Sequence, residues 1–149
     1  MQREIEPLLG YNFNVISHFI QNKYNRKLSE YGLTSSQAKV IYFLSAHGSQ
    51  NQTDLQNRLY IKASSMNGII ESLIKNECIT KESSKEDKRT KVIHLTDKGE
   101  KLEQTIWSVV LELEEEIGEG ITKEEQHVMI SLMKKIQQNM RPDAHGGGK

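Results

Sequence analysis

The chain has 149 residues, a length typical of one ordinary domain that buries a core without help from disulfides or metals. Its single cysteine excludes an internal disulfide framework. Lysine plus arginine equals aspartate plus glutamate at 20 each, so the net charge neither favours nor excludes a nucleic-acid partner. No apolar run is long enough to span a membrane and the N-terminus lacks a signal-peptide pattern, so the sequence predicts a soluble, cytoplasmic protein.

Charge is distributed unevenly along the chain. Between Arg58 and Lys98 cations outnumber anions, whereas the segment 112–125 is rich in glutamate. A basic middle and an acidic end indicate that only one part of the molecule faces a polyanion. Charge alone is equally compatible with ordinary solvated helix faces.

Apolar residues recur at helical spacing through the first third of the chain. The spacing predicts a long first helix over 9–31, which Gly32 ends. Thr34 and Gln37 stand in the capping-box positions of a second helix, which ends at Gly48.

The middle of the chain predicts two more helices and then two strands. Asn51 or Thr53 caps a short third helix, and a fourth helix covers 63–76. Residues 79–82 and 91–95 form two short strands, which a charged turn connects.

Two helices complete the predicted chain. Thr96 caps the fifth helix, whose apolar residues alternate at steps of three and four, close to a heptad seam. Two glycines interrupt this pattern, and Thr122 with Glu125 forms the capping box of a sixth helix. The apolar positions of these two helices are Leu102, Ile106, Val109, Leu113, Ile117, Met129, Leu132, Met133, Ile136 and Met140.

The order helix, short helix, helix and two-stranded hairpin is what a winged helix-turn-helix requires. The predicted fold class is therefore mainly α with a small β-hairpin wing. The fourth helix is the candidate recognition helix, because Ser64, Ser65 and Asn67 face outward near its N-terminus. Their short side chains can reach base edges or phosphates in a major groove, although they would equally cap or solvate an ordinary helix.

The turn between the strands adds a second basic element. Four cations lie within the segment 85–91, a turn whose side chains are not expected to pack in the core. We expect Lys88, Arg89 and Lys91 to reach phosphates, and an arginine at this position also suits a narrow minor groove. Asp87 is well placed to orient Arg89.

The stretch KEDKRTKVIHLTDKGEKL resembles the wing and the following helix start of the MarR-type regulators. That family carries an Asp-x-Arg wing followed by a Leu-Thr-x-x-Gly pattern. Asp87 and Arg89 match the first part, and Leu95, Thr96 and Gly99 match the second.

The resemblance continues more loosely over 9–140. It implies a homodimer of intertwined N- and C-terminal helices, with recognition helices in successive major grooves of duplex DNA and wings in the flanking minor grooves. The expected divisions are a single domain over 1–142, a DNA-binding lobe over 33–97, dimerisation helices over 5–31 and 98–140, and a disordered tail over 143–149.

The sequence departs from the family pattern at four positions. Gly68 and Ser72 stand where many members carry arginines, so the recognition helix is weakly basic. Glu77 replaces the glycine that usually ends this helix, and Lys62 occupies the usual polar cap position. These changes predict weaker or less specific DNA binding, which a close approach at Gly68 would partly offset. The residues expected at the DNA interface are Lys62, Ser64, Ser65, Asn67, Gly68, Asp87, Lys88, Arg89 and Lys91.

The resemblance also implies a sensor. A small aromatic or amphipathic effector would bind where the lobe meets the dimer helices and release the protein, a repressor, from a pseudo-palindromic operator. The pattern favours ordinary core or surface for each candidate side chain taken alone. The candidates are Tyr11, Phe13, His18, Tyr42 and His47, together with Trp107.

Other functions have little support. The pattern favours a buried, inert thiol at Cys78 over an oxidant sensor. The histidines lack metal-ligand spacing and no catalytic motif is present, so no cofactor, metal or enzymatic activity is expected. The alternative is a winged-helix module that binds a protein partner, which the wing arginine makes less fitting.

Overall fold

The computed structural model describes residues 2–142, and the expected tail at 143–149 lies outside them. The described chain is mainly helical with one small sheet, which confirms the predicted fold class. It divides into two compact units, with the boundary between Leu113 and Glu114. The elements are α1 (Leu9–Ser29), α2 (Ser35–His47), β1 (Gln50–Asn51), α3 (Gln52–Leu59), α4 (Ala63–Lys75), β2 (Ile79–Ser83), β3 (Lys91–Leu95), α5 (Asp97–Ile117) and α6 (Lys123–Met140).

Two capping boxes fix the starts of α2 and α6, as the sequence predicts. The Thr34 side chain accepts a hydrogen bond from the Gln37 backbone N–H at 3.2 Å, and the Gln37 side chain accepts from the Thr34 N–H at 3.0 Å. Thr122 and Glu125 repeat the arrangement at 3.1 and 2.9 Å. Each box satisfies backbone donors that have no partner inside the helix.

A short strand that the sequence does not predict precedes α3. The β1 residues Gln50 and Asn51 pair with Ile93 and Val92 of β3. Two polar residues carry no strand signal, so only the pairing with β3 identifies them. Asn51 also caps α3, since its side chain accepts from the Asp54 backbone N–H at 2.8 Å.

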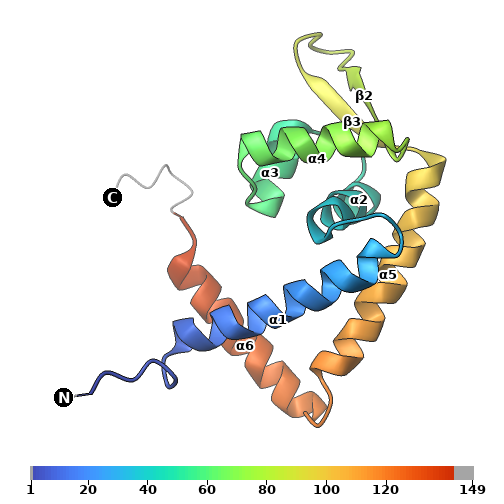
Figure 1. The fold of residues 1–149 in the computed structure, drawn as a ribbon. Helices are drawn as coiled ribbons and strands as arrows, with labels where there is room; N and C mark the ends of the chain where they lie inside the picture. The colour runs from blue at the N-terminus through green and yellow to red at the C-terminus, as the bar shows by residue number, and fades with distance from the viewer. Residues whose placement is uncertain (1, 143–149) are drawn as a thin grey trace. The chain divides into compact units, whose positions relative to one another are not determined.

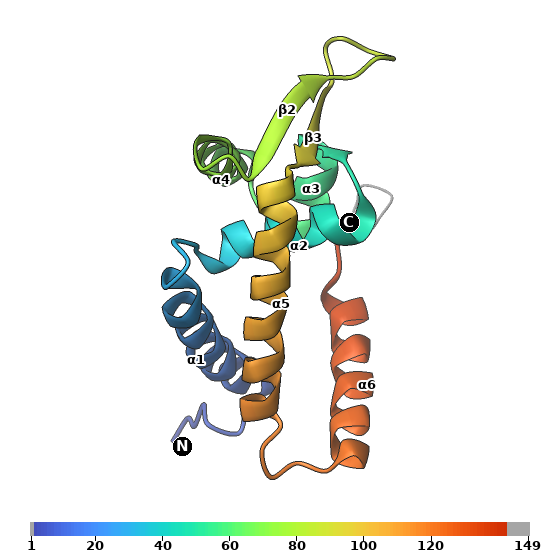
Figure 2. The ribbon, with the colours of Figure 1, turned by 90° about the vertical axis from the view of Figure 1, so that its right-hand side faces the viewer.

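The sheet is antiparallel with the strand order β1-β3-β2. In its long hairpin Ile79 pairs with Leu95 and Ser83 pairs with Lys91. This β2–β3 hairpin projects from the end of the first unit that lies away from α1 (Figures 1 and 2). α4 lies near the base of the hairpin, in contact with β2, α2 and α3. The wing and the candidate recognition helix therefore share one end of this unit.

A core of aliphatic side chains holds the lobe together. It combines the inward stripes of α2, α3 and α4 with one residue from each long strand and with residues from the middle of α5. Burial of each such side chain stabilises the fold by about 1.5–3 kcal/mol. The fully buried members include Leu28, Val40, Ile41, Leu55, Met66, Ile70, Leu73, Ile79 and Ile93.

The connection from α4 to α5 explains the Leu-Thr-x-x-Gly pattern. Thr96 donates from its backbone N–H to the Cys78 carbonyl oxygen at 3.0 Å and accepts from the Gly99 N–H at 3.1 Å, so it caps α5 and ties it to the chain after α4. A Cβ atom at Gly99 would overlap the Cys78 carbonyl oxygen and the Leu95 side chain. Glu77 adopts φ +62°, the left-handed conformation that glycine adopts without strain.

Apolar side chains remain exposed on the helices at both ends of the chain. On α1 Leu9, Ile16 and Phe19 are 68, 52 and 61% exposed. α6 buries no side chain within the described residues, and its Val128 and Leu132 are 59 and 51% exposed. Among residues 2–142, none of the helices is both long and apolar enough to cross a membrane.

Candidate nucleic-acid interface and ligand cavity

The first two turns of α4 form an exposed polar surface. Met66 and Ile70 anchor the helix in the core, and their spacing turns the remaining positions outward. Ser64, Ser65 and Asn67 are exposed there. The expected interface residues of this helix therefore lie together on one surface.

The start of α4 suits the close approach of a phosphate. Lys62, the residue before the helix, is extended and exposed, and its side chain makes no cap hydrogen bond within the described chain. First-turn N–H groups of such a helix attract anions. A Cβ atom at Gly68 would meet no other atom within 4 Å, so this position is open on its outer side.

The Asn67 side chain is tied to the helix before it. Gln52, the first residue of α3, donates from Nε2 to Asn67 Oδ1 at 2.5 Å. The carbonyl oxygen of the same Gln52 side chain accepts from Lys81 Nζ of β2 at 3.4 Å. A chain of polar contacts thus connects the wing strand to the recognition helix.

Ser72 does not share the outward face of α4. Its hydroxyl accepts a hydrogen bond from Gln37 Nε2 of α2 at 2.9 Å. The contact is partly buried, so Ser72 helps join α4 to α2. The missing arginine at this position therefore coincides with a packing role inside the lobe.

The wing turn is shaped by the Asp87 carboxylate. Oδ1 accepts from the Arg89 backbone N–H at 3.0 Å, and Oδ2 accepts from the Thr90 hydroxyl at 3.3 Å. A carboxylate that binds the backbone two residues ahead forms an Asx turn. Asp87 thereby orders the backbone that presents Lys88 and Arg89, whose side chains are exposed.

A polar notch of about 350 Å³ separates the start of α3 from the hairpin. Three cations, Lys81, Arg89 and Lys91, line it opposite the first residues of α3. Lys91 Nζ also donates to Ser83 Oγ at 2.8 Å, which holds this ammonium on the hairpin. The sequence alone does not indicate the contribution of α3 and β2, because only the fold brings them beside the wing turn. The notch is lined by Asn51, Gln52, Thr53, Lys81, Arg89, Thr90 and Lys91.

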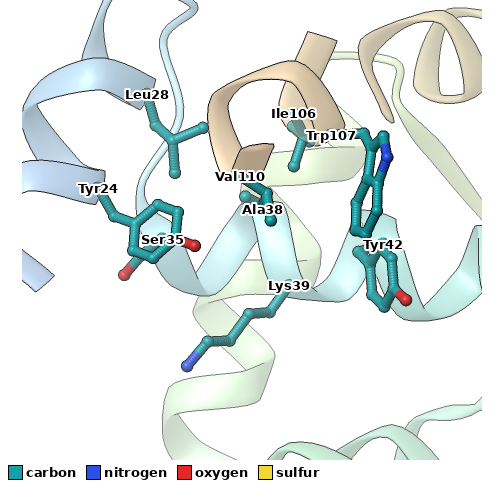
Figure 3. A pocket seen from close by; sticks show the side chains of 9 residues that line it. All are labelled: Tyr24, Leu28, Ser35, Ala38, Lys39, Tyr42, Ile106, Trp107 and Val110. Atoms are coloured by element: carbon teal, nitrogen blue, oxygen red, sulfur yellow. The ribbon is translucent and has the colours of Figure 1, made fainter. Parts of the chain in front are cut away.

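A separate, apolar cavity of about 200 Å³ lies between α1, α2 and α5 (Figure 3). Tyr42 and Trp107 stack along one side, with ring centroids 5.8 Å apart and planes inclined by 14°. Ser35 and Lys39 supply polar groups. The lining consists of Tyr24, Leu28, Ser35, Ala38, Lys39, Tyr42, Ile106, Trp107 and Val110.

Two of the predicted effector residues meet in this cavity, namely Tyr42 and Trp107. The structure does not bring the other candidates into its lining. His47 lies at the end of α2, where its ring stacks on Phe43 at 5.6 Å. The remaining candidates, Tyr11, Phe13 and His18, lie along α1.

Cys78 lies in the core just after α4 and is 1% exposed. Burial raises the pKa of its thiol above the ordinary value of 9.0, and the Lys98 ammonium partly opposes this effect. Lys98 is held nearby, since its Nζ donates to the Asn76 carbonyl oxygen at 2.7 Å. A protonated, enclosed thiol is a poor nucleophile. Within residues 2–142 no cluster of histidine, cysteine and acidic side chains could hold a metal ion.

Comparison with known proteins identifies a family whose sequence pattern this chain shares. The model of the MarR family matches residues 33–91. The HTH-type transcriptional regulator YpoP of Bacillus subtilis is 32% identical over 104 residues, which cover 70% of each chain. YwoH of the same organism, another HTH-type transcriptional regulator, is 29% identical over 130 residues, or 87% of this chain and 94% of that protein.

A solved structure has the same fold along nearly its whole length. The chain of the Staphylococcus aureus MepR–DNA complex is 25% identical and superposes with a TM-score of 0.83. The match covers 89% of this chain and 98% of the MepR chain.

Proposed function

The chain belongs to the MarR family of winged helix-turn-helix transcription regulators, and we propose that it acts as a homodimeric, cytoplasmic repressor of a pseudo-palindromic operator. The observation that supports this proposal is the placement of α4 and the wing on one end of the lobe, with polar and cationic side chains exposed on both. Membership of this family favours DNA over a protein partner for this surface.

The major groove would receive the start of α4. Ser64, Ser65 and Asn67 would face base edges, while Lys62 and the first N–H groups of the helix would bind backbone phosphates. Gly68 would let the helix backbone approach the duplex closely. These contacts are mostly neutral, so we propose that phosphate binding by the wing supplies much of the affinity.

The wing would lie along the DNA backbone beside α4. Lys88, Arg89 and Lys91 would bind phosphates, with Arg89 reaching toward the minor groove. Asp87 would act through the backbone turn that presents Arg89, since its carboxylate binds the Arg89 N–H and the Thr90 hydroxyl.

Dimerisation would cover the exposed apolar faces of α1 and α6. Exposed apolar side chains along a helix that buries none of its residues within 2–142 are typical of an interface. A two-fold dimer would place its two recognition helices about one DNA turn, ~34–36 Å, apart. Multi-angle light scattering tests this proposal directly, because a monomer over the working concentration range would exclude the two-fold operator.

The effector would bind the cavity between α1, α2 and α5. Its apolar lining and the stacked pair of Tyr42 and Trp107 suit a small planar aromatic molecule, with a polar substituent toward Ser35 or Lys39. Because α2 belongs to the DNA-binding lobe, a ligand wedged against it would change the position of α4. We expect such a ligand to lower the affinity for DNA.

The decisive experiment measures fluorescence-anisotropy binding to duplex DNA from the gene's own upstream region. Random duplex of equal length serves as the control, and both are titrated with salt. A regulator binds the upstream duplex more tightly and loses affinity steeply as salt rises. Equal, weak binding to both duplexes at low salt would contradict specific operator recognition.

A further inference from the structure

The contacts that join Lys81, Gln52 and Asn67 allow only one arrangement of hydrogen-bond donors and acceptors. The Lys81 ammonium carries donors and no acceptor, so the Gln52 atom 3.4 Å from it must be the carbonyl oxygen Oε1. The Gln52 amide nitrogen then faces Asn67 and donates to it. Consequently the Asn67 atom that Gln52 contacts must be the acceptor, Oδ1.

This direction decides what Asn67 offers to a partner. With Oδ1 turned to Gln52, the NH₂ group of Asn67 occupies the other branch of the side chain and carries two N–H donors. The side chain is exposed on the outward surface of α4. Asn67 is thus arranged as a donor, although asparagine can in general either donate or accept.

We propose that Lys81 and Gln52 are positioning residues that restrict Asn67 to base edges with acceptors, and so set a preference for guanine at the contacted position. The proposal rests on the proposed binding of α4 in the major groove. There guanine presents two neighbouring acceptors, O6 and N7, whereas adenine presents an acceptor at N7 and a donor at N6. An asparagine free to turn would choose adenine, because its oxygen and nitrogen match N6 and N7 together.

The substitution Gln52→Glu should reverse which end of the Asn67 amide faces residue 52, with little change in side-chain shape. A glutamate keeps an oxygen toward Lys81 but has no N–H to donate to Asn67. Asn67 then turns its NH₂ group to the new carboxylate and presents Oδ1 to the groove. The preferred base changes from guanine to adenine, whose N6 donor stands where guanine has O6.

The test selects binding sites from a randomised duplex pool and then measures all four bases at each position of the best site. For the wild type we expect a position where guanine binds about tenfold more tightly than adenine, within the range for one bidentate contact. Gln52→Glu inverts this ratio, Asn67→Ala abolishes it, and Lys81→Met, which no longer fixes the direction, reduces it to about twofold or less.

Gln56→Glu is the matched control. Gln56 lies one turn further along α3, and its Oε1 is 3.5 Å from Gln52 Nε2. The substitution adds the same negative charge beside Gln52 but leaves Gln52 able to donate to Asn67. It therefore keeps the guanine preference, which separates the direction of the hydrogen bonds from a general effect of charge.

The outcomes distinguish this inference from the function on which it rests. A wild type that selects no sequence from the pool would overturn both. A wild type that selects a site, with an unchanged base preference in Gln52→Glu or Asn67→Ala, would overturn the inference and leave the DNA-binding function intact. The same inversion in Gln56→Glu would also overturn the inference.

Discussion

The Thr96 hydroxyl donates a hydrogen bond to the Glu77 carbonyl oxygen at 2.7 Å. One side chain thus holds the end of the recognition-helix segment against the start of α5. The bond fixes the left-handed Glu77 in place, and the helix that leaves the lobe starts from it. The stability of this junction can be tested separately from DNA binding.

The substitution Glu77→Gly should raise the free energy of unfolding by about 0.5–1 kcal/mol. The left-handed conformation costs a residue with a side chain about 1–2 kcal/mol, and glycine recovers most of this at some cost in chain entropy. Urea denaturation followed by circular dichroism measures the change. Glu71→Gly, within the regular part of α4, should instead destabilise the protein by about 1 kcal/mol.

The substitution Gly99→Ala should destabilise the protein by about 1–3 kcal/mol, the range for overpacking. The added methyl group would overlap the Cys78 carbonyl oxygen, and a backbone atom cannot turn aside. Gly68→Ala is the matched control, because nothing lies within 4 Å of the new atom and alanine favours a helix. Equal effects of the two substitutions on the urea midpoint would refute the close approach.

The substitution Arg89→Ala should weaken duplex binding by about 1–3 kcal/mol and reduce the salt slope by about one unit. The backbone bond from Arg89 to Asp87 remains, so the fold of the wing should not change. Lys101→Ala removes an equal charge from the exposed surface of α5 and should leave both quantities nearly unchanged. A salt slope equal to that of the wild type would exclude Arg89 from phosphate binding.

The Cys78 thiol should react slowly with a thiol reagent at pH 8 in the native state and rapidly in denaturant. Its burial raises the pKa, so the folded state disfavours the thiolate. The unfolded chain can ionise Cys78 more easily than the folded protein can. The stability of the fold is therefore unaffected by this thiol below pH 9.0 and falls as the pH rises above that value. A Cys78→Ala variant should lack this part of the pH dependence. Rapid native-state labelling would contradict the enclosed thiol.

Trp107 should report directly on the effector cavity. It is the single tryptophan of the chain and it stacks on Tyr42 at the cavity wall. An aromatic ligand bound there should quench or shift its emission, and the same titration should release labelled duplex. Tyr42→Ala should weaken both responses together. Release of DNA without any change in Trp107 emission would place the effector elsewhere.

The sequence predicted the fold well, because its strongest signals are local. Capping boxes, helix-ending glycines and apolar periodicity act within a few residues, and they located nearly every element. β1 was missed because Gln50 and Asn51 become a strand only by pairing with β3. The end of α1 was placed two residues late, since the chain after Ser29 turns toward Gly32.

Less of the candidate site than of the fold could be predicted from the sequence. The serines of α4 and the basic wing could be located from local patterns. The roles of Gln52 and Lys81 could not, because they arise where α3, α4 and β2 meet in space. The cavity likewise combines residues from three helices. Two of these residues, Tyr24 and Val110, stand in no local sequence pattern that indicates ligand binding.

The way Asp87 anchors the wing has a consequence for how this regulator can evolve. Its carboxylate holds the turn through the backbone of Arg89 and the hydroxyl of Thr90, not through the side chains that point outward. Positions 88 and 89 can therefore exchange one residue for another while the loop keeps its shape. Substitutions there could raise or lower the affinity for all target promoters together, because phosphate contacts act on every sequence alike, without first having to rebuild the loop that carries them.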